Sequence, residues 1–306
     1  METTAQICAL FSVRAKSYIL IAEHILRSTL RLILSLYIIK EGSKMTQSER
    51  RLYLIRALQS ERAECAAIEI PKSEQAQSDL LRALMNVRMP RPVSPEFLKI
   101  QDEYLQIERD RRGVVDSGCL PSVPADERLV LWQGDMTTLK ADAIVNAANS
   151  QMLGCFCPLH SCIDNIVHSR SGIQLRLLCN DIMTRQGHEE PAGRAKITPA
   201  FNLPSKYILH TVGPIIHGRV TEKDSALLAG CYRSCLELAA KNGCKSVAFC
   251  CISTGEFHFP NEPAAEIAVK TVQAFLNEHD TQMRVIFNVF KDTNLAIYQK
   301  LLGVKA

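Results

Sequence analysis

From residue 128 onward, short apolar runs alternate with longer stretches of helical periodicity, and this alternation restricts the fold more than any other feature. Apolar residues three and four positions apart indicate helix faces, whereas short apolar runs bounded by turn residues indicate strands. We expect strands at 129–132, 143–146, 195–200, 207–212, 247–252 and 284–290, and helices at about 162–180, 224–242, 262–278 and 292–302. This order predicts an α/β fold, with parallel strand pairs in a sheet covered by helices on both faces.

The sequence between residues 45 and 120 predicts a small all-helical extension that precedes this domain. Apolar positions such as Leu52, Ile55 and Leu58 recur at helical spacing, and a second run ends at Gly113 after a proline-rich break. Two or three helices are expected here, followed by a turn-rich connector at 114–127 and the main domain at 128–306.

Residues 1–44 differ from the rest. Their most apolar run, 32–39, is far shorter than the roughly twenty residues of a membrane span. An amphipathic, acid-poor segment of this kind could be a transit peptide or a membrane-surface helix. We favour the plainer alternative that translation starts at Met45 and that this leader is not part of the folded unit.

The net charge and the cysteine content argue against two classes of protein, nucleic-acid binders and secreted disulfide scaffolds. The net charge is only +4, and no segment carries the basic stripe that a dedicated nucleic-acid binder needs. Nine of the 12 cysteines lie in 155–251, several in strand-like apolar runs. Reduced thiols in a cytoplasmic protein explain this pattern better than a secreted disulfide scaffold does. We therefore expect neither a nucleic-acid nor a membrane partner.

A cluster of thiols and imidazole directly follows the strand expected at 143–146. Cys155, His160 and Cys162 are soft ligands of the kind that zinc prefers. No further Cys/His pair follows at finger-like spacing, which favours an open coordination position and hence chemistry. Cys157 leaves alternatives open, since it could replace Cys155 or act as a fourth ligand. The cysteines could also be ordinary buried thiols.

Three polar segments follow expected strands, where α/β sheets bind ligands. Asp135, after Gly134, can accept from an amino group such as that of adenine, and Asn149 offers a donor and acceptors for sugar hydroxyls. The turn 253–260, Ser-Thr-Gly-Glu-Phe-His-Phe-Pro, can present backbone N–H groups to a diphosphate. It lacks the Gly-Lys-Ser/Thr signature of a P-loop.

Together, Gly-Asp-Met-Thr at 134–137, Asp-Ala-Ile-Val-Asn-Ala-Ala-Asn-Ser at 142–150 and Ile-Ser-Thr-Gly-Glu-Phe at 252–257 resemble the macrodomain family over about 128–306. The loop 154–168 is similar to that of the zinc-dependent, protein-ADP-ribose hydrolase subgroup. The resemblance implies a three-layer α/β/α sandwich with a mixed sheet and a helical amino-terminal extension. It places Asp135 on adenine, Asn149 near the distal ribose, and one zinc ion on Cys155, His160 and Cys162. The remaining residues assigned to ligand binding are Met136, Ser253, Thr254, Gly255, Glu256 and Phe257.

The activity implied is zinc-dependent removal of mono-ADP-ribose from modified protein side chains. In some members of the subgroup the modified protein is a lipoyl-carrier protein. The open zinc position could hold water, made acidic enough to attack the anomeric carbon, or a ribose hydroxyl. Asp164 is the candidate for a base or a water-orienting group, with Asn149 as the second catalytic residue. A helix-start role, with the Asp164 carboxylate on backbone N–H groups, is the plainer alternative. The alternative function is a non-catalytic ADP-ribose reader with a structural zinc; a zinc-stapled nucleic-acid module is disfavoured by the low charge.

Overall fold

The computed structural model describes residues 45–279 and 281–305, and within it Gln47–Ala306 is one folded unit. The leader expected at 1–44 lies outside the described residues. In the described part of the chain, seven strands form one mixed sheet, in which β3, β9, β8, β5 and β7 run parallel and β2 and β6 are antiparallel edges. In spatial order these strands are β2 (Ser122–Val123), β3 (Asp126–Gln133), β9 (Arg284–Val289), β8 (Ser246–Phe249), β5 (Ala143–Ala147), β7 (Tyr207–Thr211) and β6 (Ala195–Pro199).

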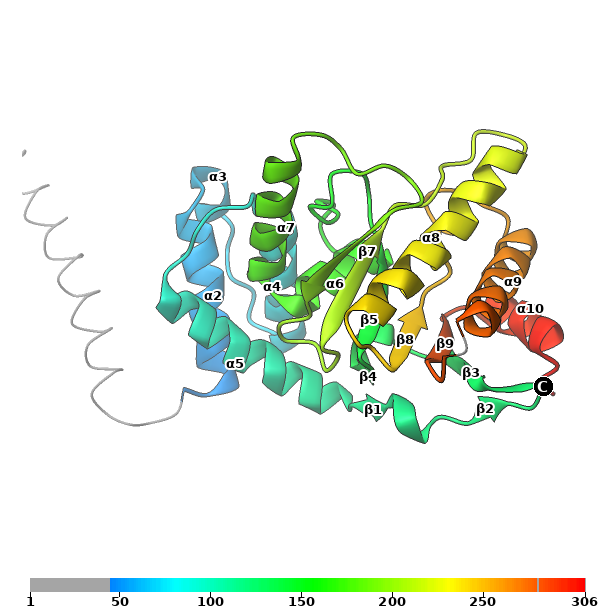
Figure 1. The fold of residues 1–306 in the computed structure, drawn as a ribbon. Coiled ribbons are helices and arrows are strands. Elements are labelled where there is room, and N and C mark those ends of the chain that lie inside the picture. The colour runs from blue at the N-terminus through cyan, green and yellow to red at the C-terminus, as the bar shows by residue number, and fades with distance from the viewer. Residues whose placement is uncertain (1–44, 280, 306) are drawn as a thin grey trace, which may run out of the picture. The chain divides into compact units, whose positions relative to one another are not determined.

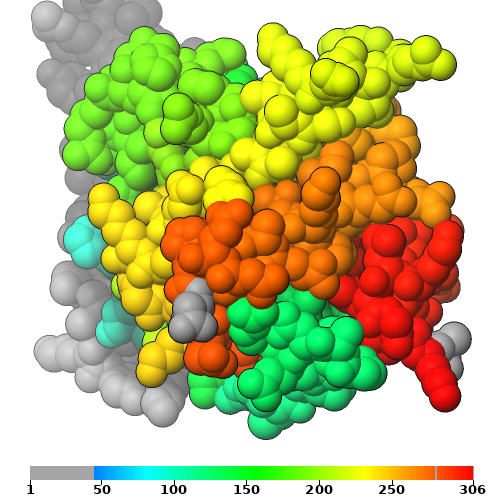
Figure 2. Space-filling model, turned by 45° about the vertical axis from the view of Figure 1, so that its right-hand side comes forward, coloured from blue at the N-terminus to red at the C-terminus, as the bar shows by residue number. Residues whose placement is uncertain are grey.

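Helices cover both faces of this sheet, as the sequence predicts. On one face lie α8 (Glu222–Lys241), α9 (Asn261–Glu278) and α10 (Asp292–Leu302), which Figure 2 shows side by side in yellow, orange and red. On the other face lie α6 (Ile163–Ser171) and α7 (Ile173–Gln186) (Figure 1). Each face buries its own apolar cluster, with Phe249 and Phe287 in the first and Ile144 and Ile286 in the second. The three-layer α/β/α sandwich with a mixed sheet is therefore confirmed.

The amino-terminal extension is helical and packs outside the α6–α7 layer (Figure 1). It consists of α2 (Gln47–Ser60), α3 (Ala63–Ala66), α4 (Glu74–Val87) and α5 (Pro95–Arg112). Serine side chains cap α4 and α5, and α5 ends where Gly113 adopts a φ of 86°. Gln101 of α5 accepts from the Ile173 backbone N–H at 2.9 Å and ties the extension to the start of α7. The extension is thus a fourth layer on one side of the sandwich.

Several boundaries differ from the sequence expectation for local physical reasons. The helix expected at about 162–180 is two helices, because Gly172 has a φ of 100°, which no α-helix contains. The last expected strand residues of 247–252 leave the sheet after Phe249, and Cys250 and Cys251 face a cavity instead. The connector 114–127 contains β1 (Val115–Asp116), which pairs in parallel with β4 (Leu139–Lys140), and also a short 3₁₀ turn, β2 and the start of β3.

No helix in residues 45–279 or 281–305 has the length and apolar character required to cross a bilayer.

Candidate active site

A cavity of about 610 Å³ opens at the carboxyl ends of β3, β5, β8 and β9. This volume suits a small-molecule site, and the position is where parallel sheets bind ligands. Every residue that the sequence analysis assigns to ligand, metal or catalysis lines this cavity. Segments more than a hundred residues apart in sequence therefore meet at one place, although the role of each side chain stays a prediction.

Asp135 stands at the end of β3, where it begins the 3₁₀ turn Met136–Thr138. Its carboxylate accepts from the backbone N–H and the hydroxyl of Thr137, at 3.0 and 2.7 Å, and from the Arg170 guanidinium. Partial burial works to raise the pKa of Asp135, but the charge of Arg170 and the Thr137 bonds outweigh it and leave the pKa lowered. The next residue, Met136, is 2% exposed and forms part of the cavity floor. An ionised carboxylate is thus fixed at this end of the cavity.

The turn after β8 has the geometry expected of an anion cradle. Within the described part of the chain, the backbone N–H groups of Gly255, Glu256 and Phe257 make no hydrogen bond to the protein, and the buried Ser253 hydroxyl is also unpartnered. Ser253 holds a φ of 64°, a conformation that costs a non-glycine residue about 1–3 kcal/mol. A Cβ on Gly213 would lie 1.9 Å from the Ser253 hydroxyl oxygen, so glycine is required where this neighbouring segment passes the turn.

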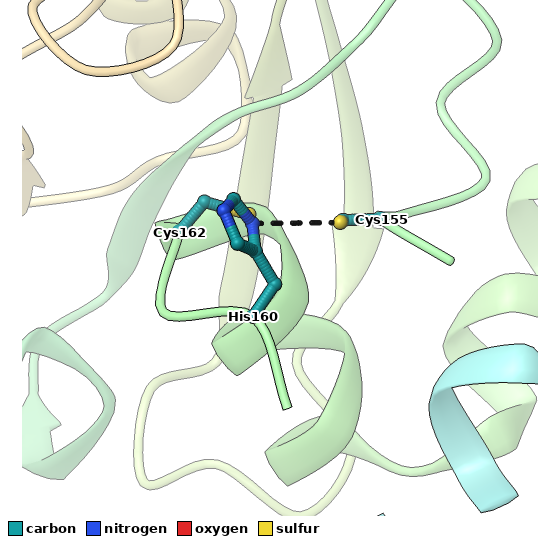
Figure 3. Close-up of side chains that lie close together, drawn as sticks. All are labelled: Cys155, His160 and Cys162. Carbon is teal, nitrogen blue, oxygen red and sulfur yellow. Dashed lines mark hydrogen bonds between the residues drawn. The ribbon is translucent and has the colours of Figure 1, made fainter. Parts of the chain in front are cut away.

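The predicted metal ligands converge. The Sγ atoms of Cys155 and Cys162 and one ring nitrogen of His160 all lie within 4.8 Å of one another. Figure 3 shows Cys155 opposite His160, with 3.6 Å between the Cys155 sulfur and His160 Nδ1. Burial, the largest cause, raises the pKa of the Cys162 thiol to about 12, and a coordinated cation would lower it. Two thiols and an imidazole at this separation fit a zinc ion.

Cys157 is separate from this group. Its side chain is exposed, its sulfur lies 4.0 Å from the Pro158 carbonyl oxygen, and its backbone N–H points at the Cys155 sulfur at 3.4 Å. The first residue of the thiol pair, rather than the second, is therefore the one directed at His160 and Cys162.

Asp164 lies beside the metal cluster and is 5% exposed. Its two carboxylate oxygens accept from the side-chain amides of Asn146 at 2.8 Å and Asn149 at 3.3 Å. Cys162, not Asp164, caps the start of α6, since its sulfur accepts from the Asn165 backbone N–H at 3.4 Å. Burial raises the pKa of Asp164 to about 6, against the lowering effect of the Asn146 bond and Arg176. The helix-start alternative for Asp164 therefore does not describe its contacts.

Phe290 and Arg170 are among the cavity residues to which the sequence analysis gave no role. Phe290, directly after β9, is 76% exposed and lines the cavity mouth, where an aromatic ring can stack on a base. The sequence analysis includes Phe290 in the strand expected at 284–290, whereas β9 ends at Val289, so no sequence signal marked this residue. Arg170 lies on α6 and contacts Asp135, 35 positions earlier in the chain. No sequence pattern indicates this pairing.

A second buried group, His168, Cys179 and His210, also brings three donor atoms within 4.8 Å. Both ring nitrogens of His210 already face partners, with Asn146 Nδ2 at 3.2 Å and Thr198 Oγ1 at 2.9 Å. His210 therefore has no ring nitrogen left for a metal ion, and we assign this group no metal.

The sequence is similar to those of known proteins. A protein named protein-ADP-ribose hydrolase from Treponema medium is 54% identical over 261 residues, covering 85% of this chain and all of the relative. A protein of the same name from Staphylococcus aureus (strain MSSA476) is 48% identical, covering 81% of this chain and 93% of the relative. The Macro domain family model matches residues 145–268. The chain belongs to the macrodomain family.

Solved macrodomains have the same fold. The Trypanosoma brucei macrodomain in complex with ADP-ribose is 30% identical, with a TM-score of 0.58, covering 76% of this chain and 97% of that one. The Oceanobacillus iheyensis macrodomain with ADP is 35% identical, with a TM-score of 0.52, covering 57% of this chain and 90% of that one.

Proposed function

We propose that this macrodomain is a zinc-dependent hydrolase that removes mono-ADP-ribose from modified protein side chains. One observation carries the proposal: the Cys155, His160 and Cys162 cluster, the buried Asp164 carboxylate and the anion cradle of 253–257 line the same cavity. The relatives named protein-ADP-ribose hydrolase cover nearly all of the described part of this chain, which supports the same activity here.

The donor set fits one zinc ion per chain. The three donor atoms lie within 4.8 Å of one another, close to the span of two zinc–ligand bonds of about 2.0–2.3 Å each. Three protein ligands and one open position are typical of catalytic zinc sites. When bound, zinc would act as a Lewis acid toward a water or a ribose hydroxyl at the open position.

ADP-ribose is proposed to span the cavity from Asp135 to Asp164. Asp135 accepts from the adenine amino group, and Phe290 stacks on the adenine ring. The free N–H groups of 255–257 hold the diphosphate, a favourable pairing because these groups have no competing protein acceptor. Asn149 lies 3.3 Å from Asp164 and orients the distal ribose beside that carboxylate.

Asp164 is proposed as the general base. The oxygen of water forms a bond to the anomeric carbon, and the bond from that carbon to the side-chain atom of the modified protein breaks. The water proton passes to the Asp164 carboxylate, and Asp164 then gives this proton to the leaving atom, which regenerates the carboxylate. Asn146 and Asn149 hold the two carboxylate oxygens and so fix their direction.

The substrate class is a mono-ADP-ribosylated protein, and a lipoyl-carrier protein is the first candidate. We place this chemistry in the cytoplasm, where the many free thiols, including those lining the cavity, stay reduced.

The deciding experiment measures zinc content and then ADP-ribose release from a mono-ADP-ribosylated protein before and after chelation. About one zinc per chain and release that stops on chelation and returns on zinc addition is the expected result. Binding of free ADP-ribose without any release would instead assign a reader, and release that is indifferent to chelation would refute the zinc requirement.

A further inference from the structure

Helix α4 of the amino-terminal extension contacts the metal loop, residues 155–162, through two side chains one turn apart. Arg82 Nη2 donates to the His160 carbonyl oxygen at 2.5 Å. Asn86 accepts from the backbone N–H of Leu159 at 3.0 Å. The extension therefore fixes the backbone of a predicted zinc ligand, although it contributes no ligand itself.

Asn165 connects the same arginine to the rest of the loop. Its side-chain oxygen accepts from Arg82 Nη2 at 2.8 Å, and its amide nitrogen donates to the carbonyl oxygens of Cys155 at 3.3 Å and Cys157 at 2.9 Å. Asn165 is fully buried, so water does not replace these bonds readily. The Arg82 guanidinium thus orients the Asn165 amide, which in turn holds the Cys155 backbone. The same guanidinium also holds the His160 backbone.

The loop is held in a conformation that it would not adopt by itself. Leu159 has a φ of 57°, a backbone conformation that favours glycine. Its side chain is 43% exposed, so burial of the side chain does not stabilise this conformation. The left-handed region is unfavourable for a residue other than glycine. The Asn86 bond to the Leu159 N–H lies at this strained residue and supports it. Asn86 is 1% exposed and is anchored in turn to Ser169 of α6 at 2.8 Å.

We propose that α4 is part of the metal site, with Arg82 and Asn86 as positioning residues that hold Cys155 and His160 at the separation zinc requires. The inference rests on the proposed zinc function. It predicts that the extension contributes to zinc affinity in addition to stability. Partners outside the first ligand shell commonly change metal affinity by about 10–100-fold.

The test is zinc affinity of the full chain, measured by competition with a chromogenic chelator. Arg82→Met removes both bonds and keeps an apolar stem, and we expect zinc to bind about 10–100-fold more weakly. Arg82→Lys keeps a donor of similar reach and should recover most of the affinity. Asn86→Ala, which leaves Arg82 in place, is expected to weaken zinc binding in the same direction.

Arg50→Met is the matched control. Arg50 is an arginine of the extension that is more buried than the half-buried Arg82, being 6% exposed, and it pairs with Glu103 at 2.7 Å without touching the loop. It should lower the unfolding temperature and leave zinc affinity unchanged. Wild-type zinc affinity in both Arg82→Met and Asn86→Ala would overturn the inference alone. Failure of the wild-type chain to bind zinc would overturn the zinc proposal and, with it, this inference.

Discussion

The Asn146 side-chain amide donates to Asp164 Oδ1 over 2.8 Å, and this bond joins the core of the sheet to the candidate base. The same amide nitrogen faces His210 Nδ1 at 3.2 Å, which must then be an acceptor. The network therefore assigns the His210 proton to Nε2, which lies 2.9 Å from the Thr198 hydroxyl. A buried chain of polar groups runs from β6 to the cavity and fixes the carboxylate direction.

Asp164→Asn should separate catalysis from binding. The substitution preserves shape and an oxygen for Asn146, but it removes the ability to take up a proton. We expect kcat for ADP-ribose release to fall by about 10²–10⁴-fold, the range for loss of a general base. Calorimetry should find the Kd of free ADP-ribose within a few-fold of wild type. A variant with wild-type kcat would exclude Asp164 as the base.

Cys162→Ser should remove zinc without unfolding α6. Serine keeps a capping oxygen for the Asn165 N–H and loses the soft thiolate that zinc prefers. ADP-ribose release should fall by more than about 100-fold, beyond the usual effect of an indirect partner, while thermal unfolding changes little. Loss of activity is expected for His160→Ala as well.

Cys157→Ser is the control for the metal ligands. Because its side chain is exposed and turned from the cluster, the variant should retain about one zinc per chain and full release. Zinc loss in Cys157→Ser would show that the wrong cysteine of the pair has been assigned.

Phe290→Ala should weaken ligand binding with little cost in stability. The side chain is 76% exposed, so its removal opens no cavity in the core. Base stacking on an aromatic ring contributes about 1–3 kcal/mol, and we expect the Kd of ADP-ribose to rise by roughly tenfold. Phe201→Ala, at an exposed phenylalanine that does not line the cavity, should bind as wild type. Equal affinity in both variants would place adenine elsewhere.

Acid should destabilise the fold through its buried histidines. Burial lowers the pKa of His210 from 6.5 to about 3. Below about pH 6.5 the unfolded chain therefore binds a proton at His210 that the folded chain does not bind. The free energy of unfolding falls as the pH drops below this value. Between about pH 6.5 and 3, His210 changes the free energy of unfolding by about 1.4 kcal/mol per pH unit. Asp164, whose folded pKa is raised to about 6, acts in the opposite direction between about pH 6 and 4.

The variant His210→Gln isolates the histidine contribution, because Asp164 and His168 remain in both proteins. Urea unfolding at pH 7 and pH 5 should show a smaller loss of unfolding free energy in the variant than in wild type. Parallel losses in the two proteins would contradict the assigned His210 pKa.

Much of the fold could be read from local signals. The strand and helix order follows from apolar spacing, and the end of α5 follows from Gly113. The sequence predicts a single helix at about 162–180, because the apolar spacing continues through Gly172. That glycine is instead set at a φ of 100° beside Gln101 of the extension, and no local pattern signals this contact.

The sequence by itself determined the α/β order and proposed a metal set within eight residues, because ligands so close in the chain share one loop. Only the tertiary structure shows that the Cys155 sulfur, and not that of Cys157, lies with His160 and Cys162, since both cysteines are close enough along the chain to reach them. It also decided what supports that loop: Arg82 lies 78 positions before the His160 carbonyl that it holds. Such contacts are set by the packing of α4 on α6, and local sequence carries no record of which distant surfaces will meet.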